Sequence, residues 1–312
     1  MTHMISTLMQ EQRGGCARNP LFGRVLAIVE VILVFALTHV AYRALKSFTV
    51  IGRWDSGTNF VPGAMMILVT ILVLVLCRRR FEAYGLGVSG WREHFSMGLM
   101  CSLVLIAVWA TGYLVTMIHL DATRPPDPHA PRQIQRVAGL ALIAVPAGIA
   151  VFAALRSRRQ AAKRIPPVVS IPAILALLCV LPIVAMHYRQ RALWIQALWL
   201  FLGAGFGEEI FFRGYIQSRV DAAFGCPVRL FGVQFGVGLG VSSVLFGFIH
   251  ALNTVDYFRG RFDFGWAYGL EAVGEGILFG LIRAKTASVV PGAITHGLLD
   301  AWARIPKILL GG

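Results

Sequence analysis

Charged side chains, above all acidic ones, are scarce in this sequence. Only 14% of the 312 residues are charged, whereas an ordinary soluble protein carries about a quarter. Acidic residues number 15 against 29 basic ones, and 57% of all residues are hydrophobic. This composition excludes an ordinary soluble domain and predicts a protein that crosses a membrane several times.

Paired cysteines and zinc-binding motifs are also missing. No two cysteines have the spacing of metal ligands, which excludes a zinc ribbon, and their scatter does not indicate a disulfide framework. The helical His-Glu-x-x-His signature of many zinc peptidases is absent as well. The cysteines are Cys16, Cys77, Cys101, Cys179 and Cys226.

The basic residues cluster between apolar segments. Arg78, Arg79 and Arg80 follow the second such segment, and another basic cluster lies between residues 156 and 164. Cytoplasmic loops of membrane proteins are enriched in this way. We therefore expect no nucleic-acid partner, a cytoplasmic N-terminus, and a multi-pass protein of the bacterial cytoplasmic membrane.

Several apolar segments approach the length of about 20 residues that a membrane-spanning helix needs. The fold class predicted from them is all-α: a polytopic transmembrane bundle of about 8–9 spans. One broken or bent helix is expected near the active site, because Gly203, Gly205 and Gly207 interrupt one segment. The segments are 25–44, 60–77, 97–117, 137–155, 168–186, 192–216, 229–251, 266–283 and 286–303.

Two adjacent glutamates, Glu208 and Glu209, lie in the sixth apolar segment, and Arg213 follows. Ionisable residues at membrane depth are costly and indicate function by default. On a helix Glu209 and Arg213 share one face and are expected to form an ion pair. Glu208 lies about 100° round the helix and is more available as a base. A purely structural ion pair would explain Glu209 and Arg213 but would leave Glu208 unexplained.

Two histidines follow in later apolar segments. His250 lies four residues after Phe246, and Asp300 lies four residues after His296. Alone, His250 is typical of a core or interfacial histidine. A carboxylate beside a histidine fixes the tautomer of the ring and raises its basicity. Together with the glutamates, these pairs favour acid–base chemistry inside the bundle.

Two further patterns have less specific meanings. Gly232, Gly236 and Gly240 recur at every fourth residue, which predicts close packing between helices. Glu271 and Glu275 are also four apart. Either Glu271 lies near the membrane interface and Glu275 pairs with a basic residue of another helix, or both line a channel for substrate or water.

The three motifs together resemble those of the CPBP intramembrane proteases. This family includes the eukaryotic CAAX prenyl endopeptidases and bacterial relatives linked to bacteriocin processing and self-immunity. Its pattern is Glu-Glu-x-x-x-Arg, then Phe-x-x-x-His, then His-x-x-x-Asn or Asp. Residues 192–305 carry the resemblance, so we divide the chain into a polar segment (1–22), a transmembrane region of unassigned role (23–190) and a protease domain (191–305). The motifs read Glu208-Glu209…Arg213, Phe246…His250 and His296…Asp300.

The resemblance implies hydrolysis of a peptide bond within the membrane. Glu208 is then the general base, His250 positions the attacking water, and His296 stabilises the oxyanion with the help of Asp300. The expected partners are the lipid bilayer and a peptide or protein substrate that is membrane-associated or lipidated. The candidate catalytic residues are Glu208, Glu209, His250, His296 and Asp300, and the supporting residues are Arg213 and Phe246.

Position 300 is an aspartate in this chain, whereas the family pattern has either asparagine or aspartate there. An asparagine there donates a hydrogen bond to the oxyanion, whereas an ionised aspartate repels it. Asp300 is therefore either protonated in a dry pocket or accepts a hydrogen bond from His296 and keeps that ring cationic. The second arrangement leaves one strong donor instead of two.

No cofactor is expected, since side chains fill both the water-activating and the charge-stabilising roles. Zinc held by His250, His296 and Glu208 is the alternative. A proton-coupled membrane transporter also places carboxylates and histidines near the midplane, but it usually repeats broken helices in two halves, which this chain does not. A catalytically silent scaffold or immunity protein of the same fold is the third possibility.

Overall fold

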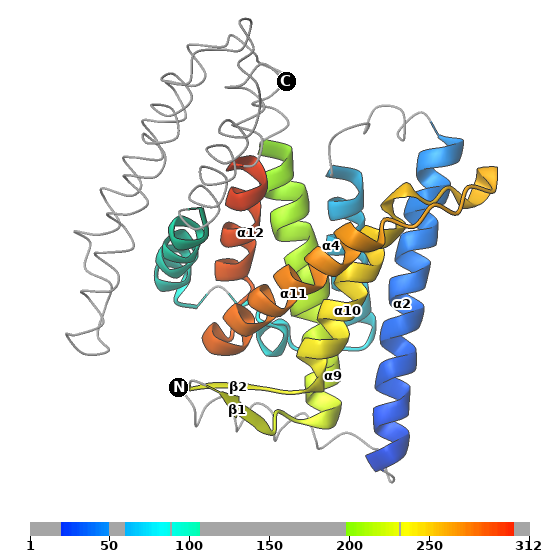
Figure 1. Cartoon of the computed structure of the whole chain (residues 1–312). Coiled ribbons are helices and arrows are strands. Elements are labelled where there is room, and N and C mark those ends of the chain that lie inside the picture. Colours follow the sequence, from blue (N-terminus) through cyan, green and yellow to red (C-terminus); the bar gives the residue numbers. More distant parts are fainter. Residues whose placement is uncertain (1–19, 50–59, 88, 107–197, 231, 303–312) are drawn as a thin grey trace, which may run out of the picture. The chain divides into compact units, whose positions relative to one another are not determined.

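The chain is seen here in a computed structural model (Figure 1). Its residues divide into two compact units. The first unit comprises Met1–Ser89 and Leu202–Ala293, and the second comprises Gly90–Phe201 and Ile294–Gly312. The boundaries of these units differ from those of the three predicted domains, and the division into domains stays a prediction. The residues described are 20–49, 60–87, 89–106, 198–230 and 232–302.

Helices make up most of the described chain, which supports the all-α prediction in its main point. The predicted spans 137–155 and 168–186, and the second half of 97–117, lie outside the described residues. In chain order the elements are α2 (Pro20–Phe48), α4 (Phe60–Leu76), η2 (Phe81–Tyr84), η3 (Leu200–Glu208), η4 (Ile210–Gln217), α9 (Ser218–Phe224), β1 (Val228–Leu230), β2 (Val233–Phe235), α10 (Val237–Ala251), η5 (Leu252–Thr254), η6 (Tyr257–Arg259), α11 (Trp266–Thr286) and α12 (Val290–Trp302).

Two of the described helical stretches, Leu21–Phe48 and Val237–Thr254, are long and apolar enough to cross a membrane. Helix α4 is apolar but shorter. Many large apolar side chains of α2 are exposed rather than packed inside the protein, including Leu33 and Leu37. A helix with such an outer surface suits a lipid environment. The total number of spans stays a prediction.

The predicted break near Gly203 takes the form of a change in helical winding. The helix runs on from residue 198 to Phe224, but η3 and η4 are π-helical. A Cβ atom on Gly63 of α4 would lie only 2.1 Å from the Gly203 carbonyl oxygen, and one on Gly207 would lie 2.4 Å from the Gly63 Cα. These glycines therefore let α4 approach η3 closely. Stretches of π-helix occur frequently at functional sites.

A short β-hairpin stands where the seventh span was expected to begin. Strands β1 and β2 pair antiparallel, and Gly232 in the turn has φ +76°, a conformation that favours glycine. Helix α10 begins only at Val237, so the predicted span 229–251 starts too early. The alternating apolar residues of the hairpin resemble the start of a span because apolar runs do not distinguish strand from helix.

The predicted close packing holds for one of the three glycines. A Cβ atom on Gly236, at the N-terminal cap of α10, would lie 2.1 Å from the carbonyl oxygen of Gly225 at the end of α9. Gly232 lies in the hairpin turn, and a Cβ atom on Gly240 would meet no described atom within 4 Å. Close packing also occurs at Gly247 of α10, where a Cβ atom would lie 2.4 Å from the carbonyl oxygen of Gly269 in α11. Figure 1 shows α11 running obliquely across α10.

The core of the first unit forms around η4. Its aromatic side chains are fully buried and contact buried residues of α2, α4 and α10. Because every side of η4 is covered, its polar residues are buried too. The core cluster contains Val31, Phe35, Met66, Leu74, Tyr84, Phe211, Phe212, Tyr215, Ile216, Val220, Phe246 and Ala272.

The second unit includes a helical stretch over residues 91–106 and most of α12. The Thr295 hydroxyl donates to the Gly98 carbonyl at 3.2 Å, which joins these two helices. A Cβ atom on Gly297 would lie 2.7 Å from the Phe201 carbonyl oxygen. Small or hydroxylated residues thus let α12 pack closely against its neighbours in this unit.

Candidate active site

Glu209 and Arg213 form a buried ion pair across one turn of the π-helical segment. Nη1 of Arg213 lies 2.9 Å from Oε1 of Glu209, and neither side chain is exposed. The guanidinium carbon also lies 4.2 Å from the ring centre of Phe246, 5.3 Å from that of Phe279 and 5.8 Å from that of Phe212. Cation–π contacts of this kind stabilise a desolvated guanidinium.

A glycine next to the third motif leaves room for the Glu209 carboxylate. A Cβ atom on Gly292, in the first turn of α12, would lie 2.9 Å from Oε2 of Glu209. Real Cβ contacts are almost never that short, so any larger residue would displace Glu209. The charges of Glu208 and Glu275 also act on Arg213, after that of Glu209. Whether Glu275 pairs with a basic residue of another helix or lines a channel stays a prediction.

Glu208 and His250 line one cavity of the first unit. Its volume is about 80 Å³, which is room for more than one water molecule. Glu208 is 9% exposed, so the carboxylate borders a largely enclosed space. The cavity is lined by Thr38, His39, Tyr42, Pro62, Met66, Glu208, Ile249, His250, Asn253 and Tyr268.

The tautomer of His250 follows from its backbone contact. Nδ1 lies 2.8 Å from the carbonyl oxygen of Phe246, and a carbonyl can only accept, so Nδ1 carries the proton. The ring is held between the rings of Phe246 and Tyr268, at centroid distances of 4.5 and 5.1 Å. In the neutral ring, Nε2 is then left as an acceptor, which suits the positioning of a water molecule.

Helix α2 supplies cavity residues that the sequence analysis missed. Thr38, His39 and Tyr42 line the cavity although they lie far outside the three motifs. Nε2 of His39 is 3.1 Å from the Tyr257 hydroxyl, and Arg43 donates to the carbonyl of Leu252. The available signal was the presence of polar residues in an otherwise apolar helix, which indicates function at membrane depth.

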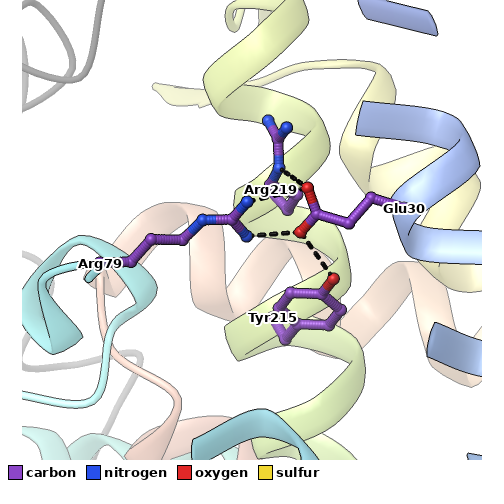
Figure 2. Close-up of polar contacts among 4 residues, drawn as sticks. All are labelled: Glu30, Arg79, Tyr215 and Arg219. Carbon is purple, nitrogen blue, oxygen red and sulfur yellow. Dashed lines mark hydrogen bonds and ion pairs between the residues drawn. The ribbon is translucent and has the colours of Figure 1, made fainter. Parts of the chain in front are cut away.

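A second polar cluster fastens α2 to the helix that carries the glutamates (Figure 2). Glu30 accepts hydrogen bonds from Arg79 at 2.5 and 2.8 Å, from Arg219 at 2.8 Å and from the Tyr215 hydroxyl at 2.8 Å. Two arginines and a hydroxyl thus satisfy one carboxylate from several directions. This cluster fixes α2 alongside η4 and α9.

His296 and Asp300 belong to the second unit. Nε2 of His296 lies 3.7 Å from Oδ2 of Asp300, which is within ion-pair range but too long for a good hydrogen bond. The His296 side chain is 5% exposed and that of Asp300 is 37% exposed. The expectation that His296 faces Glu208 and His250 stays a prediction, as do the catalytic roles.

The described part of the chain does not present a metal centre. Within it, no three side chains of His, Cys, Asp or Glu lie close enough together to hold an ion. Zinc held by His250, His296 and Glu208 stays an untested alternative, because His296 belongs to the second unit and the other two residues to the first.

The cavity brings together a buried carboxylate, Glu208, and the partly buried imidazole of His250. Residues 190–302 match the family described as type II CAAX prenyl endopeptidase Rce1-like. This match contains all three motifs and confirms the resemblance to the CPBP proteases for this part of the chain. The family and the two apolar helical stretches together support a membrane-embedded protease. No curated protein and no solved structure shows significant similarity to the chain.

Proposed function

We propose that this protein is an intramembrane endopeptidase that hydrolyses a peptide bond in a membrane-associated or lipidated protein or peptide. The observation that carries the proposal is the cavity shared by Glu208 and His250. It brings a candidate base and a candidate water-positioning group to one largely enclosed space with room for water. The match of residues 190–302 to a prenyl endopeptidase family supports the same reaction class.

In the proposed reaction a water molecule occupies the cavity between the two side chains. One O–H of the water donates a hydrogen bond to Nε2 of His250. Glu208 takes the proton of the other O–H as the water oxygen attacks the substrate carbonyl. The carbonyl π electrons move to the oxygen and form a tetrahedral oxyanion. Glu208 then passes its proton to the departing amine as the C–N bond breaks.

Glu209 and Arg213 act on this chemistry through Glu208. Their ion pair is fully buried, so it fixes the turn of helix from which Glu208 projects. The Arg213 side chain is paired with Glu209 across this turn. In this proposal Glu209 serves the ion pair and Glu208 serves the reaction, which gives each of the two adjacent glutamates a role.

The roles of His296 and Asp300 come from the family resemblance. His296 donates to the oxyanion, and Asp300 accepts from the imidazole and favours its cationic form. The distance of 3.7 Å between them shortens in this proposal when the ring becomes protonated. Catalytic hydrogen bonds are often long before the substrate binds.

The direct test uses the purified full chain in detergent micelles. The probe is a fluorescence-quenched peptide that ends in farnesyl-cysteine, two aliphatic residues and a variable last residue, the sequence that defines a CAAX tail. We expect cleavage at one bond, identified by mass spectrometry, and no effect of a strong chelator. A transporter or a silent scaffold would release no product from this peptide or from any membrane-protein segment.

A further inference from the structure

The oxyanion of the proposed reaction needs hydrogen-bond donors, and the two central side chains of the cavity do not supply one. An ionised Glu208 can only accept. Neutral His250 has its single N–H bound to the carbonyl of Phe246, so its other nitrogen also accepts. Both groups therefore suit activation of water, and the negative oxygen requires a different partner.

Two other polar side chains of the cavity have their hydrogen-bonding groups engaged or covered. The Thr38 hydroxyl donates to the carbonyl of Val34 at 2.7 Å. His39 uses Nε2 for the Tyr257 hydroxyl, and its Nδ1 is shielded from any water-sized molecule. Neither group is available to a substrate oxygen without losing an existing contact.

Asn253 differs from both in its exposure and its contacts. It lines the cavity, its side chain is exposed, and no hydrogen bond links its amide to the rest of the described chain. It lies in η5, which continues directly from α10. Residues three apart in such a helical stretch share a face, which places Asn253 beside His250. An amide NH₂ group donates at any pH.

We propose that Asn253 is a further catalytic residue, whose amide NH₂ donates a hydrogen bond to the oxyanion of the tetrahedral intermediate. This inference rests on the proposed protease function. When the water oxygen bonds to the substrate carbon, the carbonyl oxygen takes the π electron pair and Asn253 binds it. The water proton stays on Glu208 until it reaches the leaving nitrogen. Asn253 thereby supplies a donor that neither Glu208 nor His250 can provide.

The test compares Asn253→Ala and Asn253→Asp with wild type on the farnesylated peptide probe. Both variants lack the NH₂ donor, while aspartate keeps the shape of the side chain. We expect kcat to fall by about 10²–10³-fold in each, the usual loss for one oxyanion donor, with little change in KM. A phosphinate analogue of the peptide, which mimics the intermediate, should bind more weakly by a similar factor. A merely structural role would affect binding of the phosphinate and of an uncleavable ground-state peptide equally.

Tyr42→Phe and Tyr268→Phe serve as comparison variants, because both hydroxyls belong to residues of the same cavity. Wild-type kcat in Asn253→Ala, or a larger loss of kcat in either tyrosine variant, would overturn the role of Asn253. In those cases the proposed protease function still stands, provided that wild type cleaves the peptide and Glu208→Gln does not. If wild type neither cleaves the peptide nor binds the phosphinate, the inference fails together with the proposed function for this substrate class.

Discussion

Oε1 of Glu209 lies 2.9 Å from Nη1 of Arg213, and both side chains are completely buried. A charge in such surroundings is tolerated only when its partner is present. The pair is further enclosed by the aromatic rings of Phe246 and Phe279. It connects the first motif to the phenylalanine of the second, so the two motifs share one packed unit.

Arg213→Ala should therefore destabilise the protein by about 3–5 kcal/mol, because it leaves Glu209 as an uncompensated buried charge. The yield of folded protein from membranes, measured by fluorescence-detected size exclusion, should fall together with activity. Arg259→Ala is the matched control, since that arginine side chain is 72% exposed and its ion pair with Asp256 is 3.7 Å long. Normal yield and activity in Arg213→Ala would refute the structural role of the pair.

Gly292→Ala tests the contact between the third motif and Glu209. The added methyl group would lie 2.9 Å from Oε2 of Glu209, and overpacking of this kind costs about 1–3 kcal/mol. We expect a lower thermal unfolding temperature and reduced kcat. Gly240→Ala, whose added methyl group meets no described atom within 4 Å, should leave both values unchanged or slightly raised. Equal behaviour of the two variants would show that Gly292 is not needed for space.

Much of this arrangement could be predicted because the interacting residues are close in sequence. The pairs Glu209–Arg213 and Phe246–His250 are each four residues apart, so helical geometry alone brings them together. Helices α4 and α11 also begin where the apolar segments predicted. The hairpin at residues 228–235 was missed because a short apolar run does not distinguish strand from helix.

The contribution of α2 to the cavity could not be predicted in the same way. His39 lies more than 160 residues before Glu208 along the chain, and no spacing rule relates the two. The π-helical winding of η3 and η4 was missed for a similar reason. The same segment makes a close tertiary contact, between Gly63 and Gly203, and local sequence encodes neither the winding nor this contact.

Asp221 should give the stability of the protein a defined pH dependence. Its Oδ1 accepts from the Gly238 N–H at 2.9 Å. Burial nevertheless raises the pKa of this carboxyl to about 6, although Gly238 and Arg283 oppose the shift. Because the unfolded pKa is about 3.9, the folded state binds the proton more tightly. This contribution to stability is complete below about pH 4 and is lost as the pH rises through 6.

Asp221→Asn removes that titration while keeping an acceptor for Gly238. Relative to wild type, the variant should gain about 1 kcal/mol of stability between pH 5 and pH 8. Thermal unfolding in detergent at the two pH values measures this difference. A difference in stability between variant and wild type that does not change with pH would contradict the raised pKa of Asp221.

Asp300→Asn examines the departure from the asparagine of the family pattern. If Asp300 only orients His296, the variant should fold and retain substantial cleavage activity, because an amide oxygen still accepts from the imidazole. Asp300→Ala should lose more activity, since it removes the acceptor altogether. Peptide cleavage and size-exclusion profiles of both variants decide this point. Complete loss of cleavage in a well-folded Asp300→Asn would show that the carboxylate itself is required.

The central claim is that Glu208 is the base that activates water, and Glu208→Gln tests it most directly. The amide keeps the size of the side chain but cannot take a proton from water. Glu82→Gln, at an exposed glutamate of η2, is the matched control. We predict that purified Glu208→Gln folds but releases no product from the farnesylated peptide, while Glu82→Gln cleaves it at the wild-type rate. Turnover by Glu208→Gln at a rate comparable to wild type would contradict the account.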